Sequence, residues 1–219
     1  MSARLCVKIA AAGAMLLACA AATRTEAAAC DPQASVLNQA EHLNKQGQYD
    51  AALALVTPIT ARPPADFRAS YVEGMIRFDK ANAADPYVYG KPAQPLSPPL
   101  NDALQLLIKT AATLPQQDPA CVRQSTLYDI YNTIGAYYLL RGYPKDAQVY
   151  LQRGYDHQGE LSPVSRKRLL NNLGQAYLLQ FRADDAIRTF TEAKAAGSTV
   201  ADTQIGRARL LQPFKLKAQ

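Results

Sequence analysis

The stretch that decides the fold runs from Lys167 to Val200 and reads KRLLNNLGQAYLLQFRADDAIRTFTEAKAAGSTV. Its apolar residues recur three and four positions apart, which places them on one face of each of two successive helices. The order is large, large, small, aromatic, and then small, aromatic, small: Leu170, Leu173, Gly174, Tyr177, then Ala186, Phe190, Ala193. Small side chains let two helices cross closely, and the aromatic rings fill the space beside the crossing. One such hairpin leaves a face uncovered, so the pattern predicts a stack of similar units.

Three further stretches carry related patterns. The best copy has Tyr131, Ile134, Gly135 and Tyr138 on a first helix and Ala147, Leu151 and Gly154 on a second. A front copy has Ala40, Leu43, Gly47, Tyr49, Ala52 and Val56. Between these two copies Gly74 opens another unit, whose second helix is displaced to residues 101–114 with Ala103 at the small position. After Val200, residues 201–213 are expected to form one more helix that seals the last hairpin.

These spacings resemble the tetratricopeptide repeat, and the resemblance covers Gln33 to Phe214. It implies an all-α fold: a right-handed solenoid of about four helical hairpins plus a C-terminal capping helix. The expected units lie near residues 33–66, 67–117, 128–166 and 167–200, with the cap at 201–213. They follow the N-terminal segment without a linker, as one repeat domain over residues 30–219.

An insert is expected within the second unit, from Ala81 to Pro99. Its five prolines disfavour a continuous helix, and no strand alternation replaces the helical period. Proline-rich surroundings predict that Tyr87 and Tyr89 are exposed. In the same unit Glu73 and Arg77 stand where the pattern calls for apolar side chains.

Residues 1–29 are interpreted as a signal peptide. Arg4 and Lys8 precede an uncharged run over residues 9–22, which suits a signal-peptide centre and is too short to span a bilayer. Small-residue cleavage sites follow, and we expect the mature chain to be periplasmic or secreted. A competing interpretation is that residues 16–19 resemble a lipobox, in which Cys19 would be lipidated and would tether an outer-membrane lipoprotein.

Composition argues against several classes of function. The net charge of +6 becomes +4 (21 basic against 17 acidic residues) once residues 1–29 are removed, and no basic stripe suggests a nucleic-acid partner. His42 and His157 lie in different units, so neither a metal site nor a cofactor is indicated. No nucleophile stands in a G-x-S-x-G turn, and we expect no enzymatic activity. Cys30 and Cys121 remain after export and either form a disulfide or stay as separate thiols.

The resemblance implies that the first helices line a concave groove that binds a peptide or protein. The family's inward positions fall on Arg68, Tyr71, Met75, Asn132, Arg168, Asn171, Asn172 and Gln175. Glu41 and Asp129 also stand among the lining positions, so the full carboxylate-clamp set of this family is missing. The expected function is a protein-interaction scaffold in the bacterial envelope. The alternatives are an accessory lipoprotein subunit and a glycan- or small-molecule-binding helper of an envelope enzyme.

Overall fold

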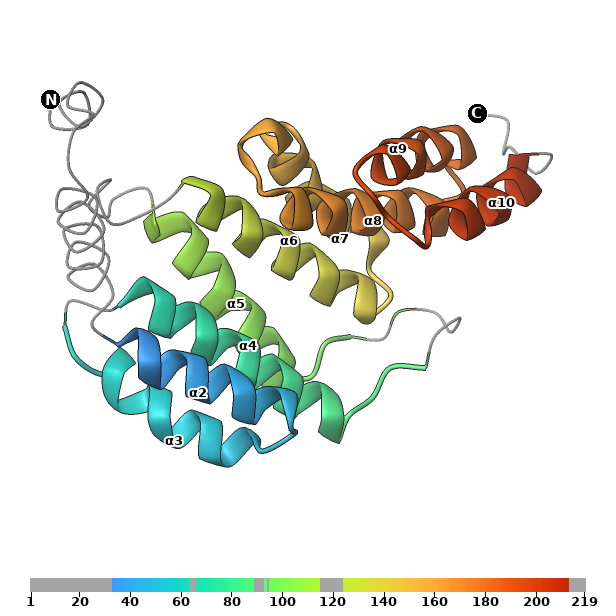
Figure 1. Cartoon of the computed structure of the whole chain (residues 1–219). Helices are drawn as coiled ribbons and strands as arrows, with labels where there is room; N and C mark the ends of the chain where they lie inside the picture. Colours follow the sequence, from blue (N-terminus) through green and yellow to red (C-terminus); the bar gives the residue numbers. More distant parts are fainter. Residues whose placement is uncertain (1–32, 64–65, 89–92, 94, 115–123, 213–219) are drawn as a thin grey trace, which may run out of the picture.

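The computed structural model describes residues 33–63, 66–88, 93, 95–114 and 124–212, and every regular element in this part of the chain is helical. The all-α fold class is therefore confirmed. Figure 1 shows the α-helices as one continuous array from α2 to α10. Their bounds are α2 Ala34–Lys45, α3 Tyr49–Thr60, α4 Phe67–Ala84, α5 Pro98–Thr113, α6 Gln124–Leu140, α7 Pro144–Tyr155, α8 Pro163–Leu179, α9 Ala183–Ala195 and α10 Ala201–Leu211.

Neighbouring helices pack in succession along the array. Each helix packs on the next one in the sequence, and in addition α2 lies against α4 and α6 against α8. The contact of α5 with α6 is less extensive than that of α3 with α4 or α7 with α8. The array is therefore least tightly joined where α4 and α5 meet α6.

Glycines mark the closest approach within three of the helix pairs. An added Cβ would lie 2.7 Å from Leu107 at Gly74, 2.4 Å from Leu151 at Gly135 and 2.6 Å from Phe190 at Gly174. In the first pair Ala40 takes the glycine's position and is fully buried, as is Val56 opposite. The structure thus shows the close helix crossing that the sequence pattern predicts.

Three hydrophobic cores follow one another along the array. The first joins α2, α3 and α4 around Leu37 and Val72, the second joins α4, α5 and α6, and the third extends from α6 to α10. Met75 packs against both the first and the second core. Tyr131 and Tyr138 pack against both the second and the third. Adjacent cores are therefore connected through a few shared side chains.

Short turns join the helices of the pairs α2–α3, α6–α7 and α8–α9, and one of these turns has an unusual residue. Gly47 and Gly142 adopt positive φ angles of 75° and 78°, which glycine tolerates without strain. Phe181, between α8 and α9, has φ 59°, and it is the only non-glycine residue with positive φ in the described ranges. Its side chain is 57% exposed. At the start of α8, the Ser162 hydroxyl accepts a hydrogen bond from the Ser165 amide and so caps the helix N-terminus.

The helix-free insert is shorter than predicted. Helix α4 continues to Ala84, because the first proline of the predicted insert is Pro86. Helix α5 begins at Pro98, because proline is tolerated in the first turn of a helix. The expected exposure of Tyr87 is also wrong. Its hydroxyl lies where a Cβ on Gly142 would come within 2.6 Å, and Arg141 lies 5.9 Å from its ring centroid. The segment after α4 is thus held against the turn between α6 and α7.

Several predictions concern residues outside those that the structure describes. These are the signal peptide over residues 1–29, the possible lipidation of Cys19, the pairing of Cys30 with Cys121, and Tyr89. Among the helices that are described, none combines the length and the apolar character needed to cross a bilayer.

Candidate functional site

Polar contacts connect the first helices of the pairs in one line. Arg68 of α4 donates to the Asn38 side chain of α2 at 2.7 Å and lies 3.9 Å from the Glu41 carboxylate. The Tyr71 and Thr133 hydroxyls join α4 to α6 at 2.7 Å.

The line continues through α8 to the segment before α10. Asn172 donates to Asn132 at 2.9 Å, and the Ser198 hydroxyl donates to Asn171 at 2.9 Å. The structure therefore brings five of the eight predicted site residues onto one side of the array.

Tyr71 lies where the charges of three other first helices converge. Burial is the main cause that raises the pKa of Tyr71 to about 12. The Asp129 and Glu41 carboxylates raise this pKa further, whereas the hydrogen bond with Thr133 and the Arg168 guanidinium lower it. Arg168 belongs to α8, two pairs away in the sequence. Charges carried by α2, α6 and α8 are therefore all near this phenol.

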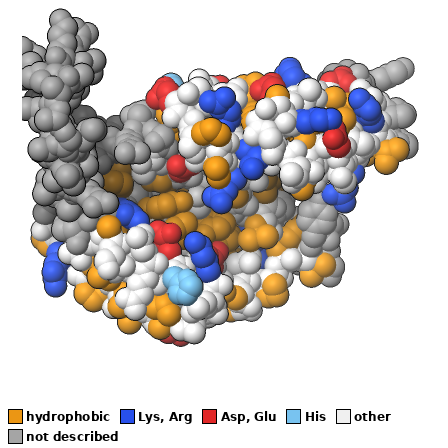
Figure 2. Space-filling model, viewed as in Figure 1, with side chains coloured by type: hydrophobic (Ala, Val, Ile, Leu, Met, Phe, Trp, Pro, Cys, Tyr) orange, Lys and Arg blue, Asp and Glu red, His pale blue; other side chains and the backbone are white. Residues whose placement is uncertain are grey.

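This side of the molecule is hollowed. Figure 2 shows a hollow between the side formed by α2 and α4 and the side formed by α6 to α8, with hydrophobic side chains inside it and Lys and Arg side chains at its margins. Met75 is half-buried, and it contributes to two cores, so its main contacts are structural.

The predicted site residues differ in how many polar contacts they already form within the protein. Arg68, Tyr71, Asn132, Asn171 and Asn172 form the hydrogen bonds described above, so their polar groups also connect neighbouring helices. Gln175 is half-buried and interacts with the rest of the chain.

Arg168 differs from the others because it is exposed and its guanidinium forms no hydrogen bond or ion pair with another described residue. Arg168 is therefore the member of the predicted set whose polar group is most available to a partner.

A second set of polar contacts joins α4 to its neighbours, and the sequence did not predict it. Asp79 accepts a hydrogen bond of 2.6 Å from Asn44 of α2 and another from the Tyr137 hydroxyl of α6. Burial raises the pKa of the Asp79 carboxyl above its ordinary value, and these two hydrogen bonds partly offset that rise. The Tyr137 ring stacks on Phe78 with centroids 3.8 Å apart.

At the end of the same helices, Arg141 is almost completely buried. Its guanidinium donates to the Asn82 side chain at 3.1 Å, to the Asp85 backbone oxygen, and to the Asp85 carboxylate at 3.2 Å. We refer to the contacts of Tyr71, Phe78, Asp79, Asn82 and Asp85 with Thr133, Tyr137 and Arg141 as the α4–α6 seam.

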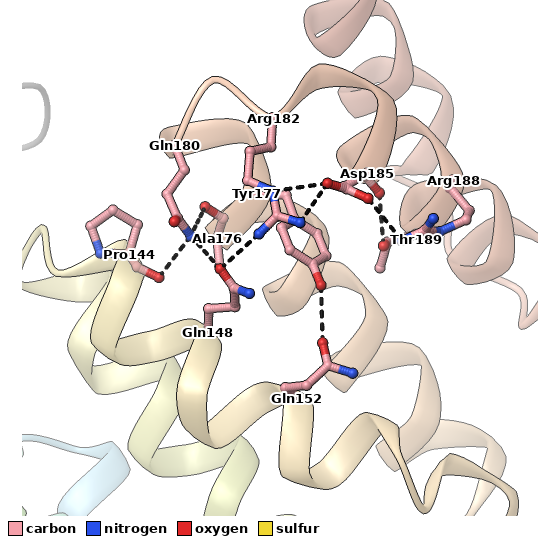
Figure 3. Close-up of polar contacts among 10 residues, drawn as sticks. All are labelled: Pro144, Gln148, Gln152, Ala176, Tyr177, Gln180, Arg182, Asp185, Arg188 and Thr189. Atoms are coloured by element: carbon pink, nitrogen blue, oxygen red, sulfur yellow. Dashed lines mark hydrogen bonds and ion pairs between the residues drawn. The ribbon is translucent and has the colours of Figure 1, made fainter. Parts of the chain in front are cut away.

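A third polar cluster lies at the turn between α8 and α9 (Figure 3). Gln180 donates to the Pro144 backbone oxygen at 3.2 Å and to Gln148 at 2.9 Å. Arg182 lies 4.5 Å from the centroid of the Tyr177 ring and bonds to Asp185. The residues on both sides of Phe181 are thus fixed to α7 and α9. The cluster connects helices, and each of these groups is engaged within the protein.

The described part of the chain contains no group of three or more His, Cys, Asp or Glu side chains placed to hold a metal ion. His42 is exposed and contacts Gln46, and exposed His157 stacks on Tyr128 with centroids 4.7 Å apart. Both histidines therefore have structural contacts of their own.

Comparison with known proteins adds no relative: no protein-family model and no curated protein matches the sequence.

Proposed function

We propose that this chain is an exported, non-enzymatic scaffold that holds a peptide or protein partner on the hollowed face of its first helices. In this proposal the helix pairs α2–α3, α4–α5, α6–α7 and α8–α9 are tetratricopeptide-like hairpins. They stack into a right-handed solenoid, and α10 caps it. The recurring glycine contacts support this, because each pair has its small residue at the same crossing.

The observation that carries the binding proposal is the line of polar contacts that runs from α2 to α8. Hydrogen bonds join α4 to α2, α4 to α6 and α8 to α6, so polar residues far apart in the sequence lie on one side of the array. Amide, hydroxyl and guanidinium groups line that face beside apolar side chains. A surface of this kind offers hydrogen bonds to the backbone of an extended segment and apolar contacts to its side chains.

Site-specific photocrosslinking in intact cells tests this proposal. A photoreactive amino acid replaces Arg168, whose exposed side chain can be exchanged without breaking a described contact. A matched control carries the same amino acid at Val149, which is 51% exposed on α7. We expect a defined crosslinked product from position 168 and none from position 149. Equal crosslinking at both positions, in variants with unchanged melting temperature, would contradict binding on this face.

Export is proposed on the N-terminal sequence alone, and intact-mass measurement of the protein recovered from cells tests it. Cleavage between Thr23 and Cys30 is the expected result. A mass equal to that of the full chain would contradict cleavage, and a lipid-modified Cys19 would show the lipoprotein alternative instead.

A further inference from the structure

Two opposite charges on the hollowed face have no partner within the described protein. The Asp129 carboxylate on α6 and the Arg168 guanidinium on α8 form neither a hydrogen bond nor an ion pair with another described residue. Both are close enough to Tyr71 to change its ionisation, in opposite directions. The third charge acting on Tyr71, Glu41, differs because Arg68 lies beside it at 3.9 Å. Asp129 and Arg168 therefore present an anion and a cation that no described residue neutralises by direct contact.

The register between α6 and α8 places these two charges side by side. A hydrogen bond of 2.9 Å from the Asn172 side chain to the Asn132 side chain joins the two helices. Asp129 precedes Asn132 by three residues and Arg168 precedes Asn172 by four, so each charge lies about one helical turn before this hydrogen bond. The axes of packed helices are about 8–10 Å apart, and side chains such as Asn132 and Asn172 meet between them. Asp129 and Arg168 form no ion pair with each other.

An extended peptide lying across α6 and α8 can bridge this spacing of the helix axes. Residues two or three positions apart in an extended chain are roughly 7 to 10 Å apart, at about 3.3 Å per residue. Two such side chains of opposite charge can therefore reach Asp129 and Arg168 together. The amide groups of Asn132 and Asn172 lie one turn away, where they can bond to the backbone of the same segment.

We propose that Asp129 and Arg168 select a dipolar segment, with an acidic and a basic residue two or three positions apart, and that they fix its direction along the face. The acidic residue contacts Arg168 and the basic residue contacts Asp129. This inference rests on the proposed peptide-binding function and specifies the partner's chemistry. A small zwitterion that carries both charges is the competing ligand.

The test uses a phage-displayed library of random linear dodecapeptides selected on the full chain. The parent should enrich peptides with an acid and a base two or three positions apart, in one order. Arg168→Gln should lose the preference for the acid and keep that for the base, and Asp129→Asn should do the reverse. The double variant Asp129→Lys with Arg168→Glu should select the opposite order. Damage to the fold cannot produce such a reversal.

Affinity for one selected peptide, made synthetically, gives a second measurement. Each neutral variant should bind it roughly tenfold more weakly than the parent, which is the size expected when one charge-assisted contact is lost. Matched controls are Lys145→Gln on α7 and Asp102→Asn on α5, both exposed. They should bind the peptide as tightly as the parent.

The outcomes separate this inference from the proposed function. Peptides that bind regardless of charge, or an unchanged order with the double variant, would overturn the dipolar selection and leave peptide binding intact. Failure of the parent to enrich any peptide would contradict the peptide-binding function and this inference with it. Displacement of the peptide by free lysylglutamate at equal concentration would show that the site reads a small zwitterion, and would overturn the peptide assignment.

Discussion

The pair α8–α9 and the α4–α6 seam are held together by different kinds of contact. In α8–α9 the contact is apolar and close: Gly174 leaves room for the buried Phe190 ring, and a three-residue turn connects the helices. At the seam the contact depends on hydrogen bonds and stacked rings, with the buried Arg141 and the half-buried Asp79 at its centre. Long connections flank this seam on both sides of α5.

The difference shows what a short connection contributes. Where the turn is short, the two helices are already near each other, and small residues at regular spacing are enough to specify the contact. Where the connection is long, the turn does not hold the two helices near each other. Polar groups with directional bonds then specify how the helices meet, at the cost of burying a guanidinium and a carboxyl.

The strongest test of the close apolar contact is Gly174→Val. The new side chain would overlap the Phe190 ring, which is 1% exposed and has no free space to move into, so we expect a loss of about 3 kcal/mol in the free energy of unfolding. Gly206→Val in α10 is the matched control, because nothing lies within 4 Å of its Cβ position. Its effect should stay within about 0.5 kcal/mol. Urea titration measures both, and equal losses would mean that the close crossing contributes nothing specific.

At the seam, Arg141→Met should lower the free energy of unfolding by about 2 to 3 kcal/mol, because bonds from a buried charged group to Asn82 and Asp85 are lost. Hydrogen exchange should increase first near residues 82–88. Arg153→Met is the control: this exposed arginine stacks on Tyr131 and Tyr150, and its loss should cost about 0.5 to 1 kcal/mol. If the control costs as much, burial is not what makes the seam arginine important.

Asp79→Asn should change the pH dependence of the free energy of unfolding. At neutral pH the variant should be more stable than the parent, by less than the amount that Arg141→Met loses. Burial raises the folded pKa of Asp79 above its ordinary 3.8, so the folded protein keeps this proton to a higher pH than the unfolded chain. The stability contributed by Asp79 is complete below pH 3.8 and is lost as pH rises through the folded value. The variant should therefore gain stability over the parent as pH rises above 3.8.

Thermal melts from pH 3.5 to 7 measure this difference. Asp50→Asn, at an exposed carboxylate paired with Lys80, is the control and should show no such trend. A flat difference between parent and Asp79→Asn would show that the carboxyl stays hydrated at the seam.

The smallest expected effect lies in the α8–α9 turn. Phe181→Gly should raise the free energy of unfolding by about 0.5 to 1 kcal/mol, because glycine adopts φ 59° without the steric cost that other residues incur. Phe181→Ala keeps that cost and should give no gain. Denaturant midpoints for the two variants measure it, and the same gain from alanine would attribute the effect to the exposed ring rather than to the backbone.

Much of the helical array could be predicted because its signal is local. Gly135 and Gly174 each stand at fixed distances from the small and large residues of the following helix, and the structure places them in close contact. The seam could not be predicted in this way. Arg141 precedes a glycine in a turn, where arginine is ordinarily exposed, and only the tertiary arrangement brings Asn82 and Asp85 to it. The proline-rich surroundings of Tyr87 predict an exposed ring, and only the tertiary arrangement brings Gly142 and Arg141 to it.

The site shows the same limit. Helical spacing and the family resemblance predicted which residues share a face, and Asn132 and Asn172 do meet. What each polar group already contacts depends on the distance between helices of different pairs, which no short pattern contains. The sequence therefore could not distinguish Asn171, which accepts a bond from Ser198, from Arg168, which forms no ion pair with another described residue.

The three cores in series also determine how the molecule would respond to a pulling force. Tension applied between α2 and α10 passes through every core in turn, and extension concentrates at the weakest joint. Directional polar bonds rupture over short displacements, so we expect the α4–α6 seam to yield first, with the apolar hairpins on either side still folded. A partner bound across α4, α6 and α8 would bridge that joint, and the force needed to separate the two halves would rise with its affinity.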